Sequence, residues 1–104
     1  MNTLARLEAT IADRRGADAE TSYVAQLLAR GTPVMARKLG EEAVEACIAA
    51  LSGSREDLVG EAADLLFHLL VLLADRDIPL ADVMAELDRR EGVSGIEEKN
   101  SRSE

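Results

Sequence analysis

Carboxylates at helical spacing are the residues of this chain that could do chemistry. Glu42 and Glu45 stand three positions apart among Ala, Val and Ile, and Glu61 and Asp64 repeat that spacing further along. Residues three or four positions apart share one face of a helix. Carboxylates on otherwise apolar helices are costly to bury unless a positive charge meets them. The two pairs therefore point to a bound cation or a cationic partner.

A break at residues 52–54, Ser-Gly-Ser, separates the two pairs and lets their helices pack antiparallel. We expect the four carboxylates to converge, and they cannot all stay ionised without compensation. Hard oxygen ligands of this kind suit Mg²⁺ or Mn²⁺. A site with more than one ion would bring a polyphosphate together with an attacking water. The predicted metal ligands are Glu42, Glu45, Glu61 and Asp64.

Two further polar residues accompany these acids. Lys38 lies on the same face as Glu42 and Glu45, on the first of these two helices. It either pairs with Glu42 one turn on or contacts a phosphate. His68 stands one turn past Asp64, so it either faces a ligand or is a hydrogen-bonded core histidine. A ferritin-like di-iron site would need a Glu-x-x-His on each of two helices, and the single histidine does not complete one. The acids could instead lie on solvated faces of their helices. Against this, they recur on the two most apolar helices of the chain.

Hydrophobic spacing and capping residues predict the elements that position these side chains. Helices are expected at about residues 3–14, 23–30, 33–51, 54–75 and 79–91. Thr32 is the expected N-cap of the third, with Pro33 at its first position. Gly40 inside that helix costs about 1 kcal/mol relative to Ala, which a nearby ligand or backbone would explain. The fold class is therefore all-α.

The two long helices are apolar on more faces than the short helices can cover. We expect a second subunit to cover the rest, giving an antiparallel helical bundle completed by a homodimer. A chain of 104 residues forms one domain, predicted over residues 1–91. Residues 92–104 lack hydrophobic periodicity and are predicted to be a flexible tail.

Charge and cysteine content restrict the partners and the compartment. The net charge of −8 argues against nucleic acid and against an anionic membrane, although not against a phosphorylated substrate carrying a divalent cation. The single Cys47 excludes an internal disulfide and is expected to be buried among apolar neighbours. No signal peptide is visible, and the longest apolar run is far below the ~20 residues of a membrane span. We expect a soluble, cytoplasmic protein.

Two segments, KLGEEAVEACIAA (38–50) and EAADLLFHLLVLL (61–73), resemble the Glu-Glu-x-x-Glu … Glu-x-x-Asp pattern of the MazG-like all-α nucleotide pyrophosphohydrolases. More narrowly, the chain resembles the phosphoribosyl-ATP pyrophosphatase family of histidine biosynthesis. That match also rests on Ser22-Tyr23 with Leu27-Leu28 and Gly31, and on the ending GVSGIEEKNSR (92–102). It covers nearly the whole chain. Phe67 stands where the family favours tyrosine, and Glu91 where it favours a basic or aromatic residue.

The resemblance implies Mg²⁺-dependent hydrolysis of phosphoribosyl-ATP to phosphoribosyl-AMP and pyrophosphate, with Mn²⁺ as a substitute. It implies the metal ligands already named, with Glu41 as a further ligand or as the base that accepts a proton from water. The expected catalytic residues are Glu41, Glu45 and Glu61. The expected substrate-binding residues are Lys38, His68, Lys99 and Arg102.

Two other functions fit the same residues. One is a MazG-like housecleaning enzyme that hydrolyses noncanonical nucleoside triphosphates, which would share the helices and metals and differ in its substrate pocket. The other is a non-enzymatic helical dimerisation module whose acids are solvated. Magnesium-dependent release of pyrophosphate separates an enzyme from such a module. Turnover of phosphoribosyl-ATP compared with a panel of deoxynucleoside triphosphates separates the two enzymes.

Overall fold

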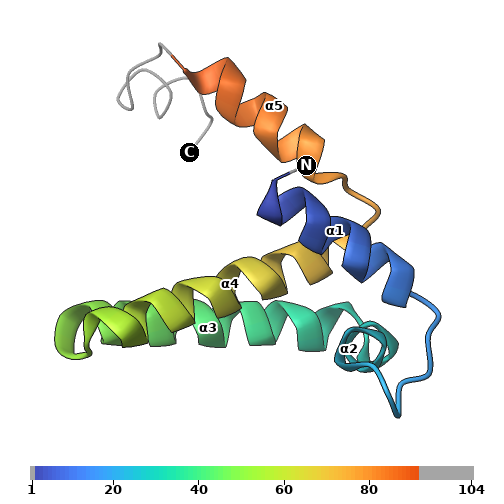
Figure 1. Ribbon diagram of the computed structural model, residues 1–104, viewed down its shortest axis with the longest axis horizontal. Coiled ribbons are helices and arrows are strands. Elements are labelled where there is room, and N and C mark those ends of the chain that lie inside the picture. Colours follow the sequence, from blue (N-terminus) through green and yellow to red (C-terminus); the bar gives the residue numbers. More distant parts are fainter. Residues whose placement is uncertain (1, 92–104) are drawn as a thin grey trace.

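Five helices make up most of the computed structural model, which describes residues 2–91. They are α1 (Thr3–Arg14), α2 (Tyr23–Arg30), α3 (Thr32–Ser52), α4 (Arg55–Asp75) and α5 (Leu80–Arg90). No strand occurs in that range, so the predicted all-α fold is confirmed. The long helices α3 and α4 lie side by side as an antiparallel hairpin, α1 and α2 pack near one end of it, and α5 projects away (Figure 1). None of the described helices is long and apolar enough to cross a bilayer.

The tip of the hairpin is held by a capping box and a close turn. The Ser54 hydroxyl accepts the Asp57 N–H at 3.1 Å, and the Asp57 carboxylate accepts the Ser54 N–H at 3.0 Å. This exchange satisfies two of the N–H groups at the start of α4. A Cβ on Gly53 would lie only 3.0 Å from the backbone of Ala49, so a larger residue there would require the turn to shift. The turn sends α4 back along α3.

The opposite end of the hairpin differs in detail from the prediction. Gly31, with φ of 96°, is the N-cap of α3, and Thr32 is already helical. The prediction of Thr32 as N-cap is therefore wrong. Its hydroxyl instead donates to the carboxylate of Asp75 at 2.6 Å, at the far end of α4. Thr32 thus joins the start of α3 to the end of α4.

The hydrophobic core lies at this same end, where four helices meet. Its buried side chains are Ile11 from α1, Val24 and Leu27 from α2, Met35 from α3, and Leu70 and Val71 from α4. Burying one such side chain contributes roughly 1.5–3 kcal/mol. Towards the tip, α4 is the one described helix beside α3, and Ala49 is the one described residue buried there. Cys47 lies in this half and is exposed, so the expectation of a buried thiol is wrong.

Helix α5 is attached through its first residue. The Leu80 N–H donates to the Glu8 carboxylate of α1 at 2.6 Å, which places a negative charge at the N-terminus of α5. None of its residues is buried. Near its other end, hydrogen bonds from Arg89 and Arg90 lower the pKa of Glu86 to about 2. In this structure, α5 therefore presents most of its surface to solvent.

Candidate metal centre

Three carboxylates meet between the two long helices. Glu42 and Glu45 come from α3 and Glu61 comes from α4, and one oxygen of each lies within 4.8 Å of the others. The spacing of three residues puts Glu42 and Glu45 on one face of α3, and the antiparallel hairpin brings Glu61 opposite them. These three residues are called the acid cluster below. The structure thus brings together three of the four predicted metal ligands.

Mutual repulsion and burial make full ionisation of the acid cluster unfavourable. Burial, together with the nearby carboxyls of Glu45 and Glu42, raises the pKa of Glu61 to about 7. Burial and the carboxyl of Glu45 also raise the pKa of Glu42, and the charge of Asp64 adds to that rise. Like charges sharing one site disfavour the ionised form in this way. A cation placed among them would reverse the effect.

Two oxygens of the acid cluster lack partners. Glu42 Oε2 and Glu61 Oε2 are both buried, and neither has a hydrogen bond to any of residues 2–91. A buried carboxylate oxygen without a partner is costly. Carboxylate oxygens are the ligands that Mg²⁺ and Mn²⁺ prefer. The donor set and its unsatisfied oxygens fit a divalent cation.

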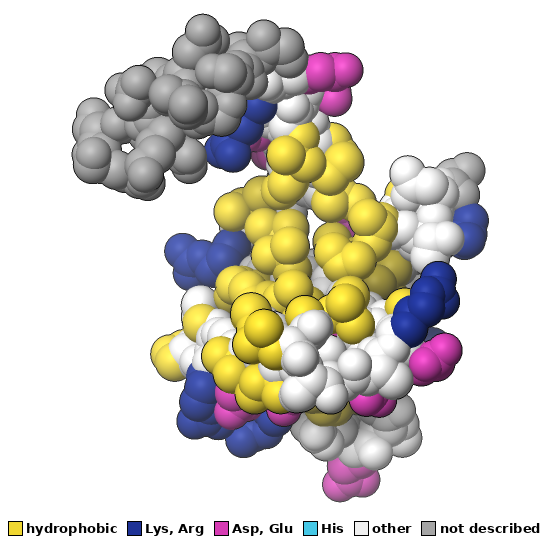
Figure 2. Space-filling model, turned by 90° about the vertical axis from the view of Figure 1, so that its left-hand side faces the viewer, with side chains coloured by type: hydrophobic (Ala, Val, Ile, Leu, Met, Phe, Trp, Pro, Cys, Tyr) yellow, Lys and Arg dark blue, Asp and Glu magenta, His cyan; other side chains and the backbone are white. Residues whose placement is uncertain are grey.

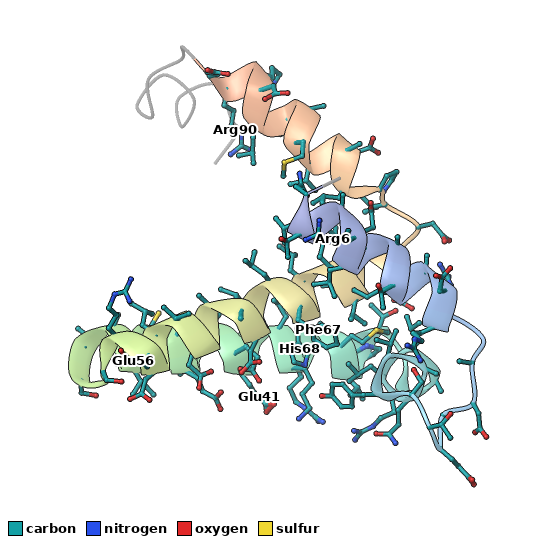
Figure 3. The ribbon with its side chains drawn as sticks, viewed as in Figure 1. Arg6, Glu41, Glu56, Phe67, His68 and Arg90 are labelled. Carbon is teal, nitrogen blue, oxygen red and sulfur yellow. The ribbon has the colours of Figure 1, made fainter. Side chains whose placement is uncertain are left out.

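Asp64 and Glu41 stand outside the acid cluster. Asp64 is exposed on α4, close enough for its charge to affect Glu42 but not among the oxygens within 4.8 Å. Glu41 is exposed on α3, and its Oε1 lies 3.9 Å from Lys38 Nζ. Of the two alternatives for Lys38, pairing with a carboxylate is present, but the partner is Glu41 rather than Glu42. Figure 3 shows Glu41 on the hairpin between Glu56 at the tip and His68 nearer α2.

Both ring nitrogens of His68 are bonded within the protein. Nδ1 lies 2.8 Å from the backbone oxygen of Asp64, and Nε2 lies 3.4 Å from the Tyr23 hydroxyl. A carbonyl oxygen only accepts, so Nδ1 carries the proton, and in the neutral ring Nε2 accepts from Tyr23. His68 as a whole residue is 7% exposed. These contacts favour the hydrogen-bonded core histidine over the ligand-facing one.

A pocket of about 390 Å³ opens beside the acid cluster on the side of the hairpin tip. Glu45 and Glu61 form part of its wall, together with Ile48, Ser52 and Asp57. The pocket therefore opens onto two of the three clustered carboxylates. Lys99 and Arg102, predicted to bind substrate, lie outside the described residues.

Similarity to known proteins covers the elements that build this centre. Residues 4–91 match the family model described as phosphoribosyl-ATP pyrophosphohydrolase. A protein of Erythrobacter litoralis named phosphoribosyl-ATP pyrophosphatase is 65% identical over 104 residues, which span 100% of both chains. A protein of the same name from Rhizorhabdus wittichii is 65% identical over 96% of this chain and 94% of that protein. Another, from Dinoroseobacter shibae, is 63% identical over 98% of this chain and 100% of that protein. This chain therefore belongs to the phosphoribosyl-ATP pyrophosphohydrolase family, and it is an enzyme.

Proposed function

We propose that this enzyme hydrolyses the α–β phosphoanhydride of phosphoribosyl-ATP, giving phosphoribosyl-AMP and pyrophosphate in histidine biosynthesis. Its relatives are named for this substrate over the full length of the chain. The observation that carries the proposal is the acid cluster, whose two buried, unpartnered oxygens suit the cation that a polyphosphate substrate needs.

Glu42, Glu45 and Glu61 would hold Mg²⁺, with Asp64 beside them as a fourth ligand. Mg²⁺, when bound, neutralises the charge of the triphosphate and lowers the pKa of a coordinated water. Mn²⁺ would substitute because it prefers the same oxygen ligands.

The remaining polar residues would orient the substrate and move a proton. Of the proposed catalytic residues Glu41, Glu45 and Glu61, only Glu41 is outside the acid cluster, which leaves its carboxylate available to accept a proton from the attacking water. Lys38, 3.9 Å from Glu41, would contact a phosphate oxygen of the substrate. Lys99 and Arg102 would add further contacts to the phosphates. Truncation after Gly95 is then expected to raise KM.

A homodimer is part of this proposal, because the half of the hairpin that carries the acids leaves apolar side chains in solvent. Leu51 is 88% exposed, Val44 59% and Val59 57%, in the same half as the acid cluster. Figure 2, a view from the left-hand side of Figure 1, shows hydrophobic side chains forming one large patch between α5 and the hairpin. Exposed apolar areas of this kind mark interaction surfaces. A second copy of the hairpin would cover them and complete a helical bundle.

The test compares phosphoribosyl-ATP with a panel of deoxynucleoside triphosphates, each with Mg²⁺ and with EDTA. Products are identified by ³¹P NMR. We expect metal-dependent release of pyrophosphate from phosphoribosyl-ATP at a kcat/KM well above that for any member of the panel. Preference for a deoxynucleoside triphosphate would instead assign the chain a housecleaning role. Pyrophosphate release that EDTA leaves unchanged would remove the metal from the proposal.

A readout besides turnover tests the metal ligands themselves. Mg²⁺ that binds only the folded state raises its melting temperature. Glu42→Gln and Glu61→Gln should abolish that rise, while Glu56→Gln, at the hairpin tip, should keep it. The proposed ligands would be wrong if Glu61→Gln responded to Mg²⁺ as the unmodified enzyme does.

We further propose a cytoplasmic location, in keeping with the single exposed Cys47.

A further inference from the structure

The few aromatic rings of this chain meet at one place. The sequence contains one Tyr, one Phe, one His and no Trp. Tyr23 of α2 stacks on Phe67 of α4 with ring centroids 6.1 Å apart and planes 15° apart. His68 meets both rings edge-on, at centroid distances of 6.2 Å from Tyr23 and 5.2 Å from Phe67. These residues form an aromatic cluster where α2 crosses α4.

Burial within the aromatic cluster is uneven. Tyr23 is 50% exposed as a residue, although Val24 and Leu27 on the same helix are buried in the core. His68 lies behind it and is buried, and Phe67 is half-buried. Tyr23 therefore gives an aromatic surface to solvent while Phe67 supports its ring. Core packing alone does not require an aromatic ring in solvent.

Contacts with Phe67 and His68 restrict the orientation of that ring. The Tyr23 hydroxyl oxygen lies 3.4 Å from His68 Nε2, and the other nitrogen of His68 donates to the backbone oxygen of Asp64 at 2.8 Å. Tyr23 is thus connected through one histidine to Asp64, three residues after Glu61 of the acid cluster. A ring already held in one orientation loses little conformational freedom when a ligand stacks on it.

The position of the aromatic cluster along α4 suits the base of a nucleotide whose phosphates lie at the acid cluster. Phe67 follows Glu61 by six residues, and at 1.5 Å per residue that is about 9 Å along the helix. The pocket beside the acid cluster extends the other way, towards the hairpin tip. In a nucleotide, one sugar separates the base from its first phosphate. Phosphates at the acid cluster therefore leave the base within reach of Tyr23.

We propose that Tyr23 binds the adenine ring of the substrate by stacking, with Phe67 and His68 holding the tyrosine ring in place. The proposal rests on the proposed function for the position of the phosphates. Stacking on an aromatic side chain suits any base, because every base has a π-face. Substrate selectivity would then come from contacts elsewhere in the site, and Tyr23 would supply affinity.

The single tyrosine allows a direct test that does not depend on turnover. In protein labelled at tyrosine, all ring resonances come from Tyr23. AMP serves as a probe with a base, and pyrophosphate as a probe without one, both in the presence of Mg²⁺. We expect AMP to move the Tyr23 ring resonances upfield and pyrophosphate to leave them nearly unchanged. A Tyr23 spectrum insensitive to AMP up to millimolar concentration would overturn the proposal.

Matched variants complete the experiment. Tyr23→Leu keeps apolar bulk and removes the ring, and it should weaken AMP binding by roughly 10-fold while leaving pyrophosphate affinity unchanged. Tyr23→Phe keeps the ring and should retain AMP binding, which also shows whether loss of the hydroxyl disturbs the fold. Equal affinity of AMP for Tyr23→Leu and the unmodified enzyme would overturn the proposal. If AMP shifts Tyr23 but phosphoribosyl-ATP is not hydrolysed, the base site stands and the proposed reaction fails.

Discussion

Thr32 Oγ1 and Asp75 Oδ2 are 2.6 Å apart, although the two residues are 43 positions apart in the chain. The bond joins the first residue of α3 to the last residue of α4, at the end of the hairpin opposite the Ser54 turn. The hairpin is therefore fixed at both ends. Fixing both ends sets which residues of α3 lie opposite which residues of α4, and so places Glu61 against Glu42 and Glu45.

Thr32→Val should destabilise the fold, because it leaves a half-buried carboxylate without its donor. A hydrogen bond to a charged group is worth about 1.5–3 kcal/mol, so the free energy of unfolding should fall by about 2 kcal/mol in urea denaturation. Thr32→Ser keeps the hydroxyl and should lose less. Equal stability of the valine variant and the unmodified protein would show that the bond contributes nothing.

The metal-free enzyme should become less stable as pH rises through the neutral range. The unfolded chain loses the Glu61 proton near its ordinary pKa of 4.5, whereas the folded protein keeps it up to about 7. Between these values the folded state binds more protons, so stability falls with rising pH and then levels off. Glu86, with a pKa lowered to about 2, acts only at lower pH, where its contribution is lost as pH falls. Urea denaturation in EDTA at pH 5 and pH 8 measures the difference.

Glu61→Gln should remove most of that pH dependence and should make the metal-free protein more stable at pH 8. The substitution eliminates a carboxylate that burial and two neighbouring carboxyls disfavour. Glu41→Gln, outside the acid cluster, is the matched control and should keep the dependence. An unchanged slope in Glu61→Gln would assign the effect to other groups.

Leu51→Glu should prevent dimerisation, since it places a charge on the most exposed large apolar side chain of the hairpin. Sedimentation velocity should show a dimer for the unmodified enzyme and a monomer for the variant. Cys47 lies one helical turn before Leu51 and supplies a second measurement. Its thiol should react slowly with a disulfide reagent in the dimer and quickly in the variant. An active, unmodified enzyme that sediments as a monomer would contradict the dimer.

Gly40→Ala should stabilise the fold by about 1 kcal/mol, because alanine loses less backbone entropy than glycine in a helix. Within the described residues, a Cβ at this position would meet no neighbouring atom within 4 Å. Gly60→Ala, on α4, has the same open surroundings and should gain a similar amount. A loss of stability or of dimer in Gly40→Ala alone would place a partner's backbone against this position.

Local sequence rules predicted most of the helical architecture. Ser54 followed by acids predicted the start of α4, and Gly31 the end of α2, because caps and glycines act within a few residues. The role of Thr32 was missed, since its partner Asp75 is 43 positions away and no local pattern reports it. Cys47 was placed inside the core because its neighbours in sequence are apolar. Burial depends on which helices pack against that face, and within residues 2–91 no helix covers Cys47.

Periodicity predicted part of the candidate site. Spacing along one helix placed Glu42 and Glu45 together, and the short Ser54 turn placed Glu61 opposite them. Periodicity did not separate Asp64 from the acid cluster, because spacing shows which face of a helix a residue lies on and not the distance between carboxylate oxygens. Tyr23 was missed as a site residue. Its contact with Phe67 and His68 depends on how α2 crosses α4, which no pattern within either helix reveals.

The uneven position of the core predicts two regions of unequal local stability. Backbone amides near Met35 and Val71 should resist hydrogen exchange, whereas those near the hairpin tip should exchange quickly in an isolated subunit. The carboxylates lie in the half with few buried side chains, so the proposed second copy would make their arrangement more rigid. By mass action, turnover per subunit would then fall on dilution. The cellular abundance of the enzyme, with no added effector, would set its specific activity.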